Sequence, residues 1–392
     1  MLNTPFSPWP SYTPEEIEAV SQVLASNRVN YWTGDLCRQF ERHFADYVGT
    51  SHAVALANGT LALDVALKAL GIGAGDEVVV TPRTFMASAS TVVTADAIPV
   101  FADVDRDTQN ITAETIAAVL TPRTKAIIPV HLAGMPCDMD PIMALAAQHG
   151  LSVIEDCAQA HGATYKGRSV GSIGHIGAWS FCQDKIMTTG GEGGMVTTDD
   201  EAVWAAMWSY KDHGKSWEAV YEQQHAPGPR LVHHSFGTNW RMLEMQAAIG
   251  LLQTERLPEW NERREWAANR IGRALERHRV VRLPAVPNYA RHAWYRLYAF
   301  VRPEHLAAGW TRDRIIEEIV AAGVPCMHGS QSEVYLEAAF DDTEWRPRER
   351  LPVARELGET SIAFLVHPTL TEAEIDKTCA VIDEVLAAAE GA

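Results

Sequence analysis

"HAVALANGTLALDVALKALGIGAGDEVVVTPRTFMASASTVVTADAIPVFADVD", residues 52–105, alternates short apolar runs with longer segments of helical spacing. The apolar runs at 52–56, 76–82 and 97–105 predict β-strands, and the segments at 59–71 and 84–96 predict the helices between them. Short apolar strands that alternate with helices pack as a mostly parallel sheet covered on both faces. The stretch therefore predicts an α/β fold.

The same alternation continues on both sides of this stretch. The further elements that we expect are helices at 14–27, 35–48 and 139–149, and strands at 125–131, 151–156, 178–181 and 193–198. Together with the strands above, these would form one sheet that lies between helices.

The pattern changes after residue 240. A long helix is predicted at 241–278 and is expected to be broken or kinked near Pro258. Beyond it, a strand at 295–301, helices at 311–322 and 371–389 and many loops predict a smaller α+β region. A chain of 392 residues favours two domains, which we place at 1–255 and 256–392.

Composition excludes several classes of partner. The formal net charge is -17 and no basic block offsets it, which disfavours nucleic acid and anionic membranes. No apolar run reaches the roughly 18 residues that a membrane span needs. The six cysteines form no CxxC pair, and no signal peptide is visible, so a cytoplasmic protein with reduced thiols is expected.

Several familiar motifs are rejected. "GIGAGD" (71–76) ends a helix and precedes a strand, the reverse of a dinucleotide-binding loop, so it predicts a tight connection. "HGKS" (213–216) lacks the earlier glycine of a phosphate-binding P-loop, and no GxSxG elbow occurs. The pairs His131 with Cys137 and Cys157 with His161 have no second pair at zinc-finger spacing, so no metal site is predicted. His161 is expected to be a hydrogen-bonded structural histidine.

Three polar features stand at the ends of predicted strands. "ANGTLAL" places residues 58–60 where a strand meets a helix, which suits either a phosphate site or an ordinary N-cap. Asp156 ends an apolar strand and is either functional, a cap or part of an ion pair. Lys185 lies in "SFCQDKIMTTGGEGGM" (180–195), where glycine density indicates a sharply turning backbone.

The combination is more specific than its parts. An anion site, a strand-end carboxylate and a loop lysine at one sheet edge suit a cofactor with a phosphate, a protonatable ring nitrogen and an aldehyde. That cofactor is pyridoxal 5'-phosphate (PLP), for which Lys185 supplies the amine and Asp156 pairs with the ring nitrogen. Phe85 is positioned either to stack on the ring or to pack in the core.

Nearly the whole chain resembles the DegT/DnrJ/EryC1/StrS sugar aminotransferases, which are fold-type I PLP enzymes. The blocks that carry the resemblance occur in the same order, among them "TGDLCRQFERHFADYVG", "ANGTLALDVALKALGIGAGDEVVVTPRTFMASAS", "VIEDCAQAHGATYKGRSVGSIGHIGAWSF", "KIMTTGGEGGMVTT" and "GTNWRMLEMQAAIGLLQ". The resemblance implies a large PLP-binding domain with a mostly parallel seven-stranded sheet, a smaller C-terminal α+β domain, and a homodimer.

The resemblance also implies individual roles. Lys185 is the catalytic residue, and Asn239 reaches the phosphate in the neighbouring subunit. Trp32 and His328 are candidate substrate contacts. The other residues expected to hold the cofactor are Gly59, Thr60, Phe85, Asp156, Gln159 and Ser180.

The chain departs from the family pattern at three places. Trp240 stands where the family has Tyr or Phe, Cys182 stands where many members have His, and the stretch 324–335 lacks the commoner His-Tyr pattern. These departures leave the substrate open.

The activity implied is transfer of an amino group from an amino acid, with glutamate as the expected donor, to a keto group of a nucleotide-linked sugar. A keto-cyclitol is an alternative acceptor. A PLP-dependent sugar dehydrase is disfavoured because those relatives have His in place of Lys185, and a non-enzymatic regulator is disfavoured because no DNA-binding module is visible. The run "GGEGG" predicts a tight return into the next strand, and Glu192 receives no role.

Overall fold

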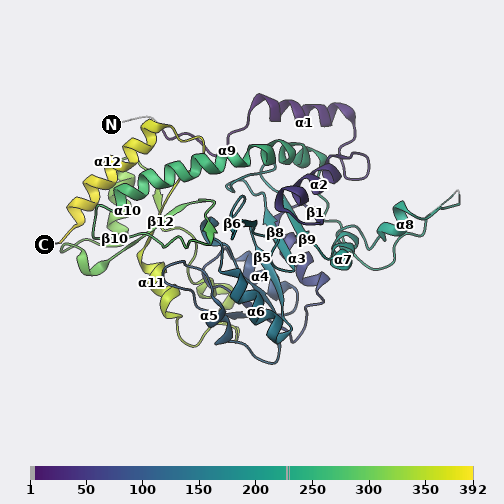
Figure 1. Cartoon of the computed structure of the whole chain (residues 1–392), viewed down its shortest axis with the longest axis horizontal. Helices are drawn as coiled ribbons and strands as arrows, with labels where there is room; N and C mark the ends of the chain where they lie inside the picture. Colours follow the sequence, from purple (N-terminus) through teal and green to yellow (C-terminus); the bar gives the residue numbers. More distant parts are fainter. Residues whose placement is uncertain (1–4, 227, 229, 392) are drawn as a thin grey trace.

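The computed structural model describes residues 5–226, 228 and 230–391, and a seven-stranded sheet forms its centre (Figure 1). The strand order is β1-β9-β8-β5-β4-β2-β3. Its strands are β1 His52–Leu56, β2 Glu77–Val80, β3 Ile98–Phe101, β4 Thr124–Ile128, β5 Ser152–Asp156, β8 Ile176–Ser180 and β9 Gly194–Thr198. Strands β8, β5, β4, β2 and β3 run parallel, and β9 is antiparallel to β8 and β1. The predicted mostly parallel sheet is confirmed.

Helices flank this sheet because its strands are buried on both faces, as the continuous apolar runs predicted. Figure 1 shows α9 along one side of the molecule, with α5 and α6 on the opposite side. The helices of the first part are α1 Pro14–Ser26, α2 Leu36–Val48, α3 Gly59–Ala69, α4 Ala87–Thr94, α5 Ala113–Ala117, α6 Met139–His149, α7 Glu201–Lys211 and α8 Trp217–Tyr221.

The helix boundaries follow local chemistry. Asn58 caps α3 by accepting a hydrogen bond from the Leu61 amide at 3.0 Å. The connection after α3 turns at Gly71 and Gly75, which both have positive φ, so "GIGAGD" is the tight connection that was predicted.

Helix α9 is one continuous element, Glu244–Leu275, with Pro258 inside it. Of the two expectations, a break at Pro258 is therefore wrong, and a kink there stays a prediction. A proline within a helix costs about 3 kcal/mol, but α9 packs along its length against α1, α2 and α12. This tertiary packing outweighs the local penalty.

The C-terminal region forms a second sheet of order β10-β12-β14-β13, antiparallel throughout, so the predicted α+β region is confirmed. Its elements are β10 Val281–Arg282, β12 Leu297–Val301, β13 Cys326–Met327, β14 Ser361–Phe364, α10 Arg312–Ala321, α11 Pro352–Thr360 and α12 Glu372–Ala389. A third sheet joins the two parts of the chain, and it contains β6 Thr164–Tyr165, β7 Arg168–Ser169 and β11 Ala290–Arg291. The division at 255/256 stays a prediction. Among the described residues, no helix is long and apolar enough to cross a membrane.

Candidate active site

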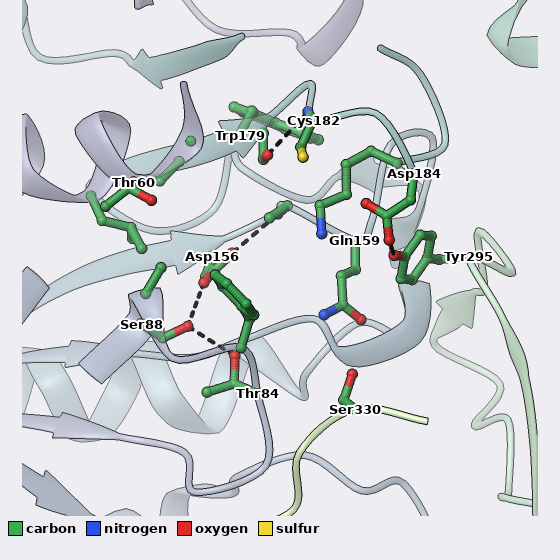
Figure 2. A pocket seen from close by; sticks show the side chains of 18 of the residues that line it. Thr60, Thr84, Ser88, Asp156, Gln159, Trp179, Cys182, Asp184, Tyr295 and Ser330 are labelled. Carbon is green, nitrogen blue, oxygen red and sulfur yellow. Dashed lines mark hydrogen bonds between the residues drawn. The ribbon is translucent and has the colours of Figure 1, made fainter. Parts of the chain in front are cut away.

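A cavity of about 660 Å³ opens at the carboxyl ends of the parallel strands (Figure 2). The beginning of α3 and the loops after β2, β5 and β8 form one side of it, and residues of the C-terminal region form a facing wall. Parallel strands bring their carboxyl ends to one edge, where ligands bind in open α/β sheets. The volume suits a small organic ligand. We call the first side the strand-end side and the second the C-terminal wall.

Asp156 is fixed at the end of β5. Its Oδ2 accepts a hydrogen bond from Ser88 Oγ at 2.8 Å, and its Oδ1 accepts one from the Ala158 amide at 3.1 Å. The Ser88 and Thr84 hydroxyls lie 2.8 Å apart, which continues the chain of polar groups seen in Figure 2. Sequence reasoning missed Thr84 and Ser88.

Burial raises the pKa of Asp156, and the hydrogen bond from Ser88 and the charge of Lys185 offset part of this rise. A buried carboxylate is costly unless a cation or hydrogen bonds compensate for it. Asp156 is therefore placed to stabilise a cationic group of a ligand.

Lys185 lies in the loop 181–193 between β8 and β9, which we call the lysine loop. Its half-buried side chain lines the cavity, with Nζ 5.2 Å from the centre of the Tyr295 ring. Within the part of the chain that the structure describes, Nζ takes part in no hydrogen bond or ion pair. Gly190 and Gly191 have positive φ, so the predicted tight return into β9 is confirmed. The amine is thus directed into the cavity by a sharply turned loop.

Gly59 and Ser180 form a close-packed corner at the beginning of α3. A Cβ at Gly59 would lie 2.4 Å from Ser180 Cβ, so no larger residue fits without a shift. The Gly59 and Thr60 amides at the beginning of α3 have no acceptor within the helix. These amides and the Ser180 hydroxyl are donors suited to an anion, as the helix dipole also favours.

Gln159 and Phe85 complete the strand-end side. Gln159 Oε1 accepts a hydrogen bond from the Ala133 amide at 2.8 Å, which leaves the Nε2 donors for a ligand. Phe85 is 69% exposed and lines the cavity, so core packing does not account for it.

Asp184, Tyr295 and Arg296 form a charged cluster that the sequence did not reveal. The Tyr295 hydroxyl donates a hydrogen bond to Asp184, and Arg296 Nη2 lies 3.4 Å from Asp184 Oδ2. Burial raises the pKa of Asp184, but Lys185, Tyr295 and Arg296 together bring it below its ordinary value. The cluster links the lysine loop to the C-terminal wall.

Three predicted site residues lie outside this cavity. Trp32 donates from Nε1 to Asp212 at 3.3 Å, and Asn239 is exposed and forms a backbone bridge with Asp212. His328 is exposed, and its Nε2 lies 3.1 Å from Asp313 Oδ1. The next residue in the chain, Gly329, does line the cavity. The structure therefore brings together seven of the predicted residues, and these are Gly59, Thr60, Phe85, Asp156, Gln159, Ser180 and Lys185.

A buried cluster beneath Asp156 contains His131, Glu155 and Cys157. His131 Nε2 lies 2.9 Å from Glu155 Oε2, and its Nδ1 accepts from the Cys137 amide at 3.0 Å. Both ring nitrogens are thus engaged in hydrogen bonds, which identifies His131 as part of the scaffold that supports the strand end.

His161 is buried against the rings of Trp179 and Phe181. Within the described ranges its ring nitrogens have no hydrogen-bond partner of ordinary geometry, although a contact with the Ser180 backbone raises its pKa slightly, so the expected hydrogen bonding stays a prediction. Burial lowers the pKa of His161 to about 3, which keeps the ring neutral.

Comparison with known proteins identifies this arrangement. The chain matches the model of the DegT/DnrJ/EryC1/StrS aminotransferase family over residues 10–383. The chain belongs to this family. The resemblance seen in the sequence blocks is therefore confirmed, and the protein is an aminotransferase.

Members of the DegT/DnrJ/EryC1/StrS family resemble the chain over almost its full length. GDP-perosamine synthase of Caulobacter vibrioides is 41% identical over 356 residues, which are 89% of each sequence. The X-ray structure of an aminotransferase from Psychrobacter cryohalolentis has 63% identity and a TM-score of 0.96, covering 98% of this chain and 99% of that one. The PLP form of the sugar aminotransferase Spr1654 from Streptococcus pneumoniae has 26% identity and a TM-score of 0.86, and the match covers 98% of this chain and 99% of that one.

Proposed function

We propose that this aminotransferase uses PLP to move an amino group from an amino acid, with glutamate as the expected donor, to a keto group of a nucleotide-linked sugar. The observation that carries the proposal is the meeting of Lys185, Asp156 and the Gly59–Ser180 corner in one cavity. A synthase of a GDP-linked sugar among the relatives supports this acceptor over a keto-cyclitol.

The residues of the cavity fit PLP at each polar end of that molecule. The corner beside Gly59 would be filled by any added Cβ, and its amide and hydroxyl donors suit the phosphate. The buried carboxylate of Asp156 would pair with the ring nitrogen, and the Gln159 amide would donate to the ring hydroxyl. The exposed face of Phe85 would cover the ring.

Each of these groups has a definite task. Bound PLP supplies an aldehyde and an electron-withdrawing ring that stabilises negative charge on the carbon that loses a proton. Lys185 Nζ would hold the aldehyde carbon until the amino group of the substrate takes its place, and the released amine would then move the proton between carbon atoms as a general base and acid. Asp156 would keep the ring nitrogen protonated, because a carboxylate in a buried site favours a cation beside it.

The experiment that tests this function separates its two halves. The PLP-loaded protein is first incubated with glutamate, and formation of 2-oxoglutarate is measured. Nucleotide-linked keto sugars and keto-cyclitols are then offered in parallel, and the amino product is identified by mass spectrometry. We expect amination of a nucleotide-linked sugar. Amination confined to keto-cyclitols, or none with any keto compound, would contradict the proposal.

We also propose a homodimer in which each subunit completes the other's site. The exposed Asn239 lies outside its own cavity, which supports a contribution to a neighbouring subunit. Co-expressed Lys185→Ala and Asn239→Ala chains test this, because a hybrid dimer would keep one intact site. Random pairing should restore about a quarter of the wild-type activity. Activity no higher than that of the separate variants would mean that the sites are not shared.

We infer a cytoplasmic location. All six cysteines are free thiols, which is typical of a reducing compartment. Fractionation of cells that produce the protein at its natural level tests this, and recovery outside the cytoplasmic fraction would contradict it.

A further inference from the structure

The backbone of the lysine loop is held by the N-terminal segment of the chain. Trp9 Nε1 donates a hydrogen bond to the carbonyl oxygen of Lys185 at 2.8 Å, although the two residues are 176 positions apart. This contact reaches the residue that carries the reactive amine, and it does so from outside the cavity.

The indole of Trp9 is itself fixed from three sides. Its ring meets the Trp260 ring of α9 edge-on, with 5.1 Å between the ring centres. It lies nearly parallel to the His367 ring, with 6.1 Å between the ring centres. The guanidinium carbon of Arg264 is 5.2 Å from the centre of the same ring. Since these contacts restrict rotation of the ring, its N–H is held toward the Lys185 carbonyl.

A second connection runs through Gln253 of α9. The Thr188 amide of the lysine loop donates to Gln253 Oε1 at 2.8 Å, and Gln253 Nε2 donates to Glu16 Oε1 at 2.7 Å. Gln253 and Glu16 are each only 1% exposed, so these hydrogen bonds are protected from water. The N-terminal segment therefore reaches the lysine loop both directly and through α9.

The other end of the segment is bonded to the C-terminal region. Ser7 Oγ donates to Glu374 Oε2 at 3.0 Å, and Thr369 Oγ1 donates to the Pro8 carbonyl at 2.8 Å. In Figure 1 the segment that starts at Ser7, bonded to α12, leads to α1, which lies over α9. Residues 7–16, which we call the strap, thus connect the C-terminal region with the lysine loop.

We propose that the strap positions Lys185, with Trp9 as its main positioning residue, and that it makes the lysine loop respond to the C-terminal region. This inference rests on the proposed function only in taking Lys185 as the reactive amine. A displacement of about 1 Å of a catalytic group can cost roughly a hundredfold in rate, so a fixed Lys185 backbone has catalytic value. A strap that only packed would leave the lysine loop unaffected when its hydrogen bonds are removed.

The test compares hydrogen exchange of the amides at 182–189 in full-length variants, with and without PLP. Trp9→Phe keeps an aromatic ring but removes the N–H. Thr369→Val releases Pro8 and also His367, whose ring lies against Trp9, but it leaves the Trp9 N–H in place. Trp310→Phe is the matched control, because it makes the same chemical change in the C-terminal region, where the ring packs against Arg314 instead of Trp9. We expect exchange about fivefold faster in Trp9→Phe and roughly twofold faster in Thr369→Val.

Lysine-loop exchange that stays at the Trp310→Phe level in both Trp9→Phe and Thr369→Val would overturn the proposal. With PLP and substrates, Trp9→Phe should also lower kcat about tenfold at nearly constant KM, as loss of positioning predicts. The exchange measurement does not require turnover. If the strap does not position Lys185, transamination would still be observed. If the protein does not transaminate these substrates, the difference in hydrogen exchange would still be observed.

Discussion

The strand-end side of the cavity and the C-terminal wall hold their side chains in different ways. On the strand-end side, Asp156 accepts two hydrogen bonds and Gly59 is packed directly against Ser180. On the C-terminal wall, Arg296 reaches across to Asp184 at 3.4 Å, and its side chain keeps 18% exposure. From this difference we expect that the strand-end side holds one constant ligand and that the C-terminal wall meets the substrates that exchange.

Lys185→Ala is expected to have the largest effect and tests the strand-end side. Transamination should fall at least about 10⁴-fold, because no other described side chain in the cavity offers a free amine. PLP should still bind through the corner at Gly59 and Ser180, as equilibrium dialysis would measure. Lys125→Ala, which removes an exposed lysine on β4, is the control. Near-normal turnover, or loss of the fold, would contradict the assignment.

The strand-end side could be predicted because its residues follow local patterns. Asp156 ends an apolar strand, residues 58–60 join a strand to a helix, and Lys185 precedes a glycine-rich return. Each of these patterns places its residue at the same sheet edge.

The C-terminal wall and the strap could not be predicted in this way. Tyr295 lies 111 positions from Asp184, and no periodicity or motif connects them. Trp9 sits in a short segment without regular structure, and its indole is placed by rings from α9 and the C-terminal region. Tertiary packing alone creates these contacts, just as it carries α9 through Pro258.

Gly59→Ala tests whether the strand-end side is as tightly packed as its contacts indicate. The new methyl would overlap Ser180, and such overpacking costs about 1–3 kcal/mol, so PLP affinity should fall about tenfold to a hundredfold. Gly73→Ala is the matched control, because a Cβ there meets only one atom, at 3.8 Å. Fluorescence titration with PLP measures both variants. Equal affinities would show that the corner does not hold the phosphate.

Arg296→Gln tests the C-terminal wall. Among the described residues that line the cavity, Lys185 and Arg296 are the two basic side chains. Both proposed substrates are anionic. Loss of a charged hydrogen bond should raise KM for one substrate about tenfold, with PLP affinity unchanged. Arg291→Gln on β11 serves as the control, and steady-state kinetics with each substrate varied in turn is the measurement. Weakened PLP binding with unchanged KM would make Arg296 part of the cofactor site instead.

Ser88→Ala should have the smallest effect and tests how finely the strand-end side is adjusted. The Ser88 hydroxyl stabilises the ionised form of Asp156, so its removal should raise the pKa of that carboxyl further. PLP with a protonated ring nitrogen needs the ionised carboxylate beside it. As the solution is acidified, the affinity for PLP should therefore begin to fall at a higher pH in Ser88→Ala than in the wild type. We expect a shift of less than about one pH unit, measured as PLP affinity against pH. Ser90→Ala on the same helix should leave the profile unchanged. PLP affinity that rises as the solution is acidified would mean that Asp156 binds PLP in its neutral form.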